Sequence, residues 1–194
     1  MTAITMKKEI VYFEEKGEKN TDETLKLAKE RALELGIKYV VVASTTGATG
    51  KKAIEIFKDT GINVVVVTHQ VGYKEPNKLL MDEQTRKFIE ENAKLVIGSD
   101  IFTTVPKLIT QKYGGFSPYN IIADTLRLFC QGMKVCVEIA VMAADAGAIP
   151  TDQEVIAIAG TARGADTAIV LKPANIHRFF EMDIREIICM PRVK

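Results

Sequence analysis

The chain has 194 residues, about the length of one ordinary domain, and 47% of them are apolar, enough for one sizeable core. Its 26 basic and 25 acidic residues give a net charge of +1, without the basic surplus that nucleic-acid binders usually show. The apolar runs are too short to span a bilayer, and the start lacks the pattern of a signal peptide. We therefore expect one globular domain over residues 1–194, with no nucleic-acid or membrane partner.

The cysteines, Cys130, Cys136 and Cys189, form no CxxC pair, and the chain has only two histidines. So sparse a set does not favour a Cys/His metal site, and we expect no bound metal. An odd number of cysteines without a disulfide pattern is typical of reduced thiols, which predicts a cytoplasmic protein. The composition leaves the oligomeric state open, and a homo-oligomer is compatible with it.

Strand-like and helix-like segments alternate along the first hundred residues. Short β-rich segments predict strands near residues 9–13, 38–44, 62–69 and 94–100. Apolar residues at helical spacing predict helices at 21–35, which Thr21 is expected to cap, 49–59 and 81–93. This order is typical of a mostly parallel sheet covered by helices on both faces, so the predicted fold is a three-layer α/β/α sandwich.

The second half of the chain is less regular. Helices are expected at 103–116 and 117–130, and a helix at 133–147 is apolar nearly all round, so we expect it to be buried. Further strands are predicted at 154–160, 167–173 and 186–191, with a short helical turn near 175–180. Nothing in this half has the composition of a linker between two domains.

The turn "ASTTGATGKK" follows the second predicted strand, and its chemistry suits a phosphate. The stretch that we expect to bind it consists of Ser44, Thr45, Thr46, Gly47, Ala48, Thr49 and Gly50. The side chains supply hydroxyls, and the glycines let the backbone approach a ligand closely. Unpaired N–H groups at the start of the next helix attract anions. On this reasoning Gly47→Val should weaken binding with little loss of stability.

The same turn is not a Walker A loop. That motif requires Gly where this chain has Thr45, and Ser or Thr where it has Lys52. The alternative interpretation is an ordinary helix N-cap in a tight strand-to-helix turn. From the local sequence alone, both interpretations stay open.

A second glycine-rich loop, in "DQEVIAIAGTARGADTAIVLKPA", follows another strand with a buried pattern. Together with "YVVVASTTGATGKKAIEIF" and "INVVVVTH", it resembles the carboxyl-terminal α/β domain of pyruvate kinase. The likeness covers residues 38–70 and 132–173, whereas residues 71–131 depart from it. Over its whole length the chain resembles the free-standing archaeal and bacterial proteins of the pyruvate kinase C-terminal-domain-like family.

The resemblance implies a ligand site made by the two loops, because several pyruvate kinases bind a phosphorylated sugar there. The second loop would contribute Gly160, Thr161, Arg163, Gly164, Asp166 and Thr167. Flavin mononucleotide (FMN) is the ligand that the free-standing relatives suggest. Because 194 residues cannot also hold the catalytic barrel, no pyruvate kinase activity is expected. A flavin-dependent enzyme, a non-catalytic sensor of a phosphorylated metabolite and a structural subunit remain alternatives.

Arg163 and the strand exit at His69 and Gln70 are further candidates. A guanidinium among small neighbours can grip a phosphate at two points, so we favour a ligand role for Arg163 over an ordinary surface role. His69 and Gln70 follow a buried strand and could contact the ligand, with His69 as a proton carrier, or be an ordinary strand exit. His177 has no such companions and is expected at the surface.

Two features of the middle region have both a functional and a structural interpretation. Glu138 interrupts an apolar helix, either as a general base or, as we favour, on a solvated edge where it pairs with Lys134. Tyr113, Phe116 and Tyr119 flank a Gly-Gly pair, where they could stack on a flat ligand ring. Packing of a loop into the core is the commoner role for such aromatic residues.

Overall fold

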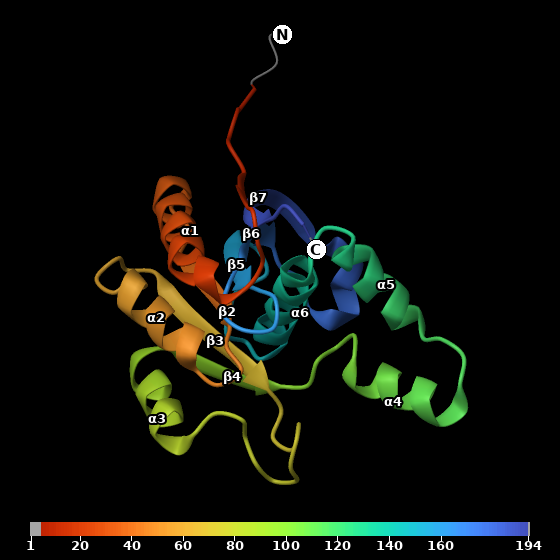
Figure 1. Ribbon diagram of the computed structural model, residues 1–194. Coiled ribbons are helices and arrows are strands. Elements are labelled where there is room, and N and C mark those ends of the chain that lie inside the picture. Colours follow the sequence, from red (N-terminus) through yellow and green to blue (C-terminus); the bar gives the residue numbers. More distant parts are fainter. Residues whose placement is uncertain (1–4, 194) are drawn as a thin grey trace.

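The computed structural model describes residues 5–193, and its strands form one sheet in the order β1-β7-β6-β5-β2-β3-β4 (Figure 1). The strands are β1 (Val11–Phe13), β2 (Tyr39–Ala43), β3 (Asn63–His69), β4 (Lys94–Gly98), β5 (Val155–Ala159), β6 (Thr167–Lys172) and β7 (Asp183–Pro191). The helices are α1 (Thr21–Leu35), α2 (Ala48–Phe57), α3 (Glu83–Asn92), α4 (Thr104–Tyr113), α5 (Pro118–Arg127) and α6 (Gln131–Asp145), with 3-10 helices η1 (Glu18–Asn20) and η2 (Ile176–Glu181). The predicted elements are all present, with ends that differ by a few residues.

The sheet is mostly parallel, as predicted. Strand β2 lies between β3 and β5 and is parallel to both, and β4 extends this parallel half beyond β3. The exception is β6, which runs antiparallel to both β5 and β7. The carboxyl ends of β5, β2 and β3 therefore meet at one edge of the sheet, where ligands collect in folds of this kind.

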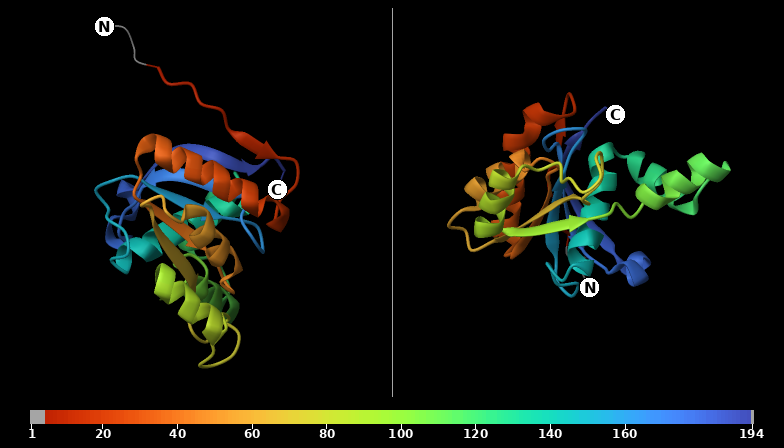
Figure 2. Two further views of the ribbon diagram at one scale, coloured as in Figure 1. Left: turned by 90° about the vertical axis from the view of Figure 1, so that its left-hand side faces the viewer. Right: turned by 90° about the horizontal axis from the view of Figure 1, so that it is seen from below.

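Helices cover both faces of the sheet, which confirms the three-layer sandwich (Figure 2). Alternate strand residues point to opposite faces: Val40 and Val42 pack in the cluster formed with α1, α2 and α3, whereas Val41 packs in the cluster formed with α6. Because both faces are covered, the central strands are apolar without alternation. Helix α6 is buried along most of its length, as its composition predicts.

The N-terminus of α1 differs from expectation. Asn20, not Thr21, is its N-cap residue, and Thr21 is the first residue of the helix. The Thr21 hydroxyl donates to the carbonyl of Glu18 at 2.6 Å and accepts the N–H of Ala165 at 3.0 Å. Thr21 thus fastens the β5–β6 loop to the start of α1.

Helices α4 and α5 stand out from the body of the molecule (Figure 2). Only Pro106 is buried in α4, and this region exposes several large apolar side chains. Tyr113, Phe116 and Tyr119 are 74%, 76% and 48% exposed. They neither pack in a core nor line the cavity described below. The interpretation as core packing is therefore wrong, because the segment that carries these residues does not fold back onto the sheet, and stacking on a ligand ring stays a prediction.

The cysteines are buried and unpaired. Burial raises the pKa of Cys130, raises that of Cys136 strongly and raises that of Cys189 to about 12, so each thiol stays protonated at neutral pH. Within residues 5–193, no helix combines the length and the apolar character needed to cross a bilayer.

Candidate functional site

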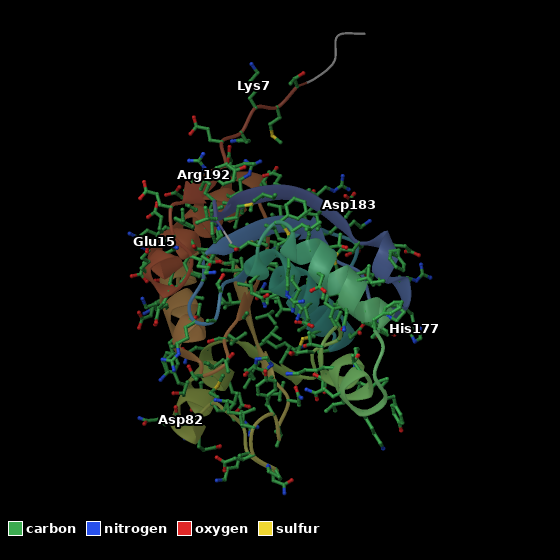
Figure 3. The ribbon with its side chains drawn as sticks, turned by 45° about the vertical axis from the view of Figure 1, so that its right-hand side comes forward. Lys7, Glu15, Asp82, His177, Asp183 and Arg192 are labelled. Carbon is green, nitrogen blue, oxygen red and sulfur yellow. The ribbon has the colours of Figure 1, made fainter. Side chains whose placement is uncertain are left out.

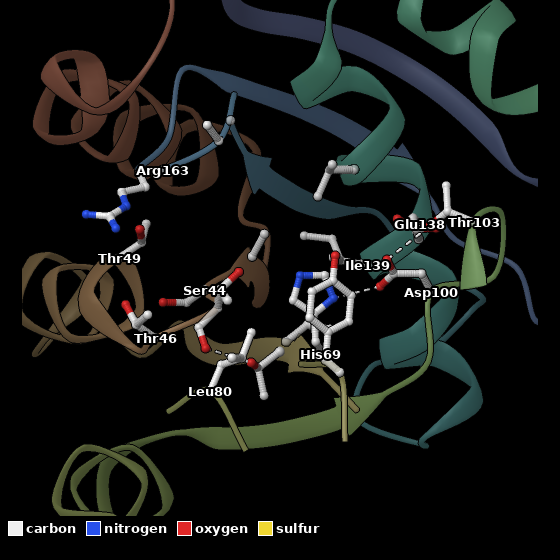
Figure 4. Close-up of a pocket in the computed structure, with 18 of the residues that line it drawn as sticks. Ser44, Thr46, Thr49, His69, Leu80, Asp100, Thr103, Glu138, Ile139 and Arg163 are labelled. Atoms are coloured by element: carbon white, nitrogen blue, oxygen red, sulfur yellow. Dashed lines mark hydrogen bonds and ion pairs between the residues drawn. The ribbon is translucent and has the colours of Figure 1, made fainter. Parts of the chain in front are cut away.

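A cavity of about 1410 Å³ lies at the sheet edge where β5, β2 and β3 end (Figure 4). Its walls come from the loops after these strands, from α6 and from the start of α4. Ten predicted site residues line it: Ser44, Thr45, Thr46, Ala48, Thr49, His69, Gln70, Gly160, Arg163 and Gly164. Segments more than a hundred residues apart in sequence are thus brought to one site.

The first loop presents hydroxyls and the N-terminus of α2 to the cavity. Ser44 holds the turn closed, because its Oγ accepts the N–H of Gly50 at 3.0 Å. The N–H of Lys51 donates to the carbonyl of Gly47 at 2.9 Å, so the N–H groups of Gly50 and Lys51 are already satisfied. The earlier N–H groups, at Ala48 and Thr49, have no acceptor within the helix and lie at the cavity wall. An anion is therefore expected against Ala48 and Thr49 rather than along the whole turn.

The two glycines of this loop serve packing, which corrects their predicted role in ligand approach. A Cβ on Gly47 would lie 2.2 Å from Cγ2 of Thr85 in α3, and a Cβ on Gly50 would lie 2.9 Å from Val66 in β3. Neither glycine lines the cavity. Gly47 also has φ of +91°, a backbone conformation that side chains other than hydrogen rarely adopt.

The expectation that Gly47→Val spares the fold is therefore wrong. This substitution should lower the free energy of unfolding by about 2 kcal/mol, from overpacking against α3 and from backbone strain. Urea denaturation followed by circular dichroism measures the effect. Gly36→Val is a matched control, because φ at Gly36 is +68° but nothing lies within 4 Å of the place that a Cβ would occupy. If both variants lost the same free energy of unfolding, the whole effect would come from the positive φ, and the packing role of Gly47 would be contradicted.

The second loop, between β5 and β6, projects Arg163 over the cavity beside Thr49 (Figure 4). Arg163 is exposed, and within residues 5–193 its guanidinium makes no hydrogen bond or ion pair. Its neighbour Ala162 has φ of +64°, a strained conformation for a residue with a Cβ. The surrounding fold therefore holds the loop in this shape and leaves the Arg163 guanidinium available for a ligand.

Asp166 supplies the restraint on this loop, which corrects its predicted role as a ligand contact. Its side chain is buried, and it accepts hydrogen bonds from the N–H of Gly17 at 2.8 Å, the N–H of Thr161 at 3.1 Å and the hydroxyl of Thr167 at 2.8 Å. Asp166, Thr161 and Thr167 do not line the cavity. Their polar atoms are used in building the loop. Gly160 lines the cavity, but a Cβ there would lie 2.8 Å from the carbonyl oxygen of Gly164, so its small size also serves loop closure.

His69 and Gln70 lie where β3 leaves the sheet. The imidazole Nδ1 of His69 is 3.0 Å from Oδ1 of Asp100, and the ring of Tyr73 stacks on the imidazole with centroids 4.2 Å apart. The Oε1 atom of Gln70 is buried and has no hydrogen-bond partner within the described residues. A buried acceptor without a donor is costly, and this oxygen is shielded from the cavity as the side chain stands.

Helix α6 contributes a buried ion pair to the cavity wall. Lys134 pairs with Glu138, as predicted, and Oε1 of Glu138 also accepts the N–H of Phe102 at 3.1 Å. Both charged residues are only 3% exposed, so the predicted solvated edge is wrong. Burial raises the pKa of Glu138, although the neighbouring Lys134 opposes this shift. The pair is buried because α5, the Phe102 segment and the strand exits pack against this part of α6.

The cavity wall carries more positive than negative side chains. The cationic residues are Lys52, Lys74, Lys107, Arg127, Lys134 and Arg163. The acidic residues are Glu18, Asp100 and Glu138. Lys52 pairs with Asp22, Arg127 with Asp124 and Lys134 with Glu138. The lining cations that make no ion pair within the described residues are Lys74, Lys107 and Arg163.

Several lining residues were not identified from the sequence. Asp100 had a usable signal, since it is the last residue of the predicted strand at 94–100 and so belongs to the same sheet edge as His69. Tyr73 and Lys107 had no such signal in the sequence. Tyr73 reaches the cavity from a loop and Lys107 from α4, and the strand pattern positions neither of these segments. His177 is exposed on η2, away from the cavity, as expected (Figure 3).

The sheet order and the loops at its carboxyl edge define an α/β domain with a cavity at that edge. The family model described as pyruvate kinase, alpha/beta domain, matches residues 22–171. The chain belongs to this family. Among solved structures, it is similar to the pyruvate kinase of Cryptosporidium parvum in complex with ADP, with 11% sequence identity and a TM-score of 0.38. That match covers 88% of this chain and 24% of the enzyme, so this chain spans about a quarter of its length.

Proposed function

We propose that the protein binds a phosphorylated small molecule, with FMN as the first ligand to test, in the cavity between the two loops. The observation that carries this proposal is the arrangement of Arg163 beside Thr49 at the start of α2. Arg163, whose guanidinium makes no bond within the described residues, and Ala48 and Thr49 at the N-terminus of α2 line the same cavity. Both favour a dianion, and a phosphate forms charge-assisted hydrogen bonds with both.

The residues fit both polar ends of FMN. Ser44, Thr46, Thr49 and Arg163 would hold the phosphate. The flavin ring carries an N–H between two carbonyls, and the carboxamide of Gln70, with its buried Oε1, complements such an edge. At about 1410 Å³, the cavity exceeds the roughly 300–1,000 Å³ of common ligand pockets and admits a nucleotide. FMN would supply hydride or electron transfer at its ring.

A non-catalytic sensor of a phosphorylated sugar is the second candidate. The phosphate cradle, formed by Ser44, Thr46, Thr49 and Arg163, would serve such a sensor as well, because the contacts to the phosphate are the same. The Oε1 atom of Gln70, which accepts no hydrogen bond within the described residues, does not separate the two candidates, because a sugar hydroxyl donates to it as well as a flavin N–H does. A structural subunit without a ligand would leave the cationic surplus and Arg163 without a role.

Arg163→Ala tests the proposal. Losing a charge-assisted hydrogen bond costs about 1.5–3 kcal/mol. We therefore expect roughly tenfold or more weaker binding of FMN in titration calorimetry. The free energy of unfolding without ligand should hardly change, because Arg163 is exposed and makes no side-chain bond within the described residues. Arg163→Lys should recover only part of the affinity, because an ammonium cannot make the planar two-point contact.

Arg178→Ala is the matched control, since Arg178 is an exposed arginine on η2 that pairs with Glu181. It should leave FMN affinity unchanged. A sugar bisphosphate is titrated in parallel. Binding of the sugar bisphosphate alone, weakened by Arg163→Ala, would support the sensor. Unchanged affinity in Arg163→Ala for any ligand that binds would contradict the proposed cradle.

A further inference from the structure

Opposite the phosphate cradle, the cavity wall carries a second set of polar groups that phosphate binding does not use (Figure 4). The imidazole of His69 lies against Asp100, whose Oδ2 accepts the hydroxyl of Thr103 at 3.1 Å. The side chains of His69 and Asp100 are 26% and 13% exposed, so this pair is largely shielded from water. Lys134 and Glu138 line the same wall.

The hydrogen bond to Asp100 decides which ring nitrogen of His69 carries the proton. A carboxylate can only accept, so Nδ1 carries the hydrogen and the neutral ring keeps a lone pair on Nε2. Burial raises the pKa of Asp100, but its hydrogen bonds with His69 and Thr103 and the charge of Lys134 act in the opposite direction, and the pKa lies below its ordinary value. Asp100 is therefore ionised at neutral pH and keeps His69 in this tautomer.

The surroundings also fix the plane of the ring. Tyr73 stacks on it at 20° between ring planes, and within residues 5–193 Nε2 makes no hydrogen bond. The charged groups around the pair are Lys134 and Glu138 from α6, with Lys107 from α4 at the same cavity. An oriented imidazole with one free, basic nitrogen is the arrangement that a general base requires.

The sheet register places this base close to the phosphate cradle. Ala43 pairs with Val67, and the N–H of Ser44 donates to the carbonyl of Val67 at 2.9 Å. Ser44 therefore lies opposite Thr68 on the neighbouring strand, and His69 is the residue after Thr68. The Cα atoms of Ser44 and His69 are thus roughly 6 Å apart. Because His69 lines the same cavity as Ser44 and Arg163, a ligand whose phosphate lies at those two residues would extend across the cavity toward Nε2.

We propose that His69 is a catalytic base that takes a proton from the bound phosphorylated ligand or from a substrate held beside it, and that Asp100 is its positioning residue. In this step the bond between the proton and its carbon or oxygen breaks, and the electron pair stays on that atom. The proton moves to Nε2 and gives an imidazolium paired with Asp100. Returning the proton restores the neutral ring, so no further reactant is needed. This inference rests on the proposed phosphate site and assigns it an enzymatic role.

The test uses 1-chloro-3-hydroxyacetone phosphate, a three-carbon chain with an electrophilic centre at its first carbon and a phosphate on its third. Nε2 attacks the carbon that bears chlorine, the new C–N bond forms and chloride leaves. We expect labelling of His69, located by peptide mass spectrometry, at a rate that saturates with reagent concentration and falls at least tenfold with excess inorganic phosphate. His177, exposed on η2, is the internal control and should label slowly without saturation.

Asp100→Asn separates positioning from a merely structural role. Asparagine cannot stabilise the imidazolium, so the pH at which labelling is half-maximal should fall, and the maximal rate should drop at least tenfold. His69→Gln should lose the saturable label while still binding inorganic phosphate in calorimetry. Saturable phosphate binding with no preference for His69 over His177, or an unchanged pH profile in Asp100→Asn, would overturn the inference.

If the proposed phosphate site is wrong but the reactive base is right, a different labelling result is expected. Chloroacetone lacks the phosphate and should label His69 without saturation, still faster than it labels His177. If both reagents label His69 preferentially, without saturation and without protection by phosphate, the reactive base stands and the proposed phosphate site fails. Arg163→Ala should raise the half-saturating concentration of the phosphorylated reagent roughly tenfold.

Discussion

Glu138→Leu is expected to lower the free energy of unfolding by about 3–5 kcal/mol. The substitution leaves the ammonium of Lys134 in a buried site without its counter-charge, which is one of the costliest changes a side chain can undergo. It also removes the acceptor of the Phe102 N–H. Urea denaturation at pH 7, followed by circular dichroism, measures this loss.

The double variant Lys134→Met/Glu138→Leu separates the charge effect from packing. Apolar residues of similar volume often replace a buried ion pair at little cost, so it should recover at least half of the stability that Glu138→Leu loses. The Phe102 N–H still lacks an acceptor, so recovery should not be complete. A double variant as unstable as the single one would show that shape, and not the unpaired charge, sets the cost.

Asp166→Ala is expected to lower the free energy of unfolding by about 3 kcal/mol. Three donors, the N–H groups of Gly17 and Thr161 and the hydroxyl of Thr167, lose a charged acceptor, and losing such hydrogen bonds costs about 1.5–3 kcal/mol each before relaxation. FMN affinity should fall as well, because the loop that carries Arg163 is no longer held. Thermal unfolding and calorimetry on the same preparation measure both effects.

Asp166→Asn and Arg163→Ala are the controls for this prediction. Asparagine keeps one carbonyl oxygen, so it should lose roughly half as much stability as alanine does. Arg163→Ala should lower affinity but not stability. If Asp166→Ala lowered affinity without lowering stability, Asp166 would be a ligand contact after all, and its role in building the loop would be wrong.

The fold could be predicted because its signals are local. Runs such as Val40–Val42 and Val64–Val67 are β-branched and apolar without alternation, which strands covered on both faces require. The reversed direction of β6 has no such signal. It depends on the tight β5–β6 loop, which returns the chain beside β5 instead of crossing over the sheet. A sequence pattern predicts that a strand exists but not which way it runs.

The site was predicted only in part, for a related reason. Strand exits identify Ser44, His69 and Arg163 as neighbours, because the ends of adjacent parallel strands share one edge. What a residue does at that edge depends on partners far along the chain. Gly47 packs against Thr85, and Asp166 binds the N–H of Gly17, so each residue serves the structure although its type also suits a ligand.

The fastening of the Arg163 loop has a practical consequence for dissecting the protein into a minimal binding unit. Every predicted ligand residue lies within the family match over residues 22–171, so that segment looks sufficient for binding. Yet Gly17 and Thr21, which hold the loop, precede it, and β7, which pairs with β6, follows it. A fragment cut at those boundaries would contain the ligand residues but not their support. The smallest autonomous unit therefore begins before Gly17 and ends after Pro191.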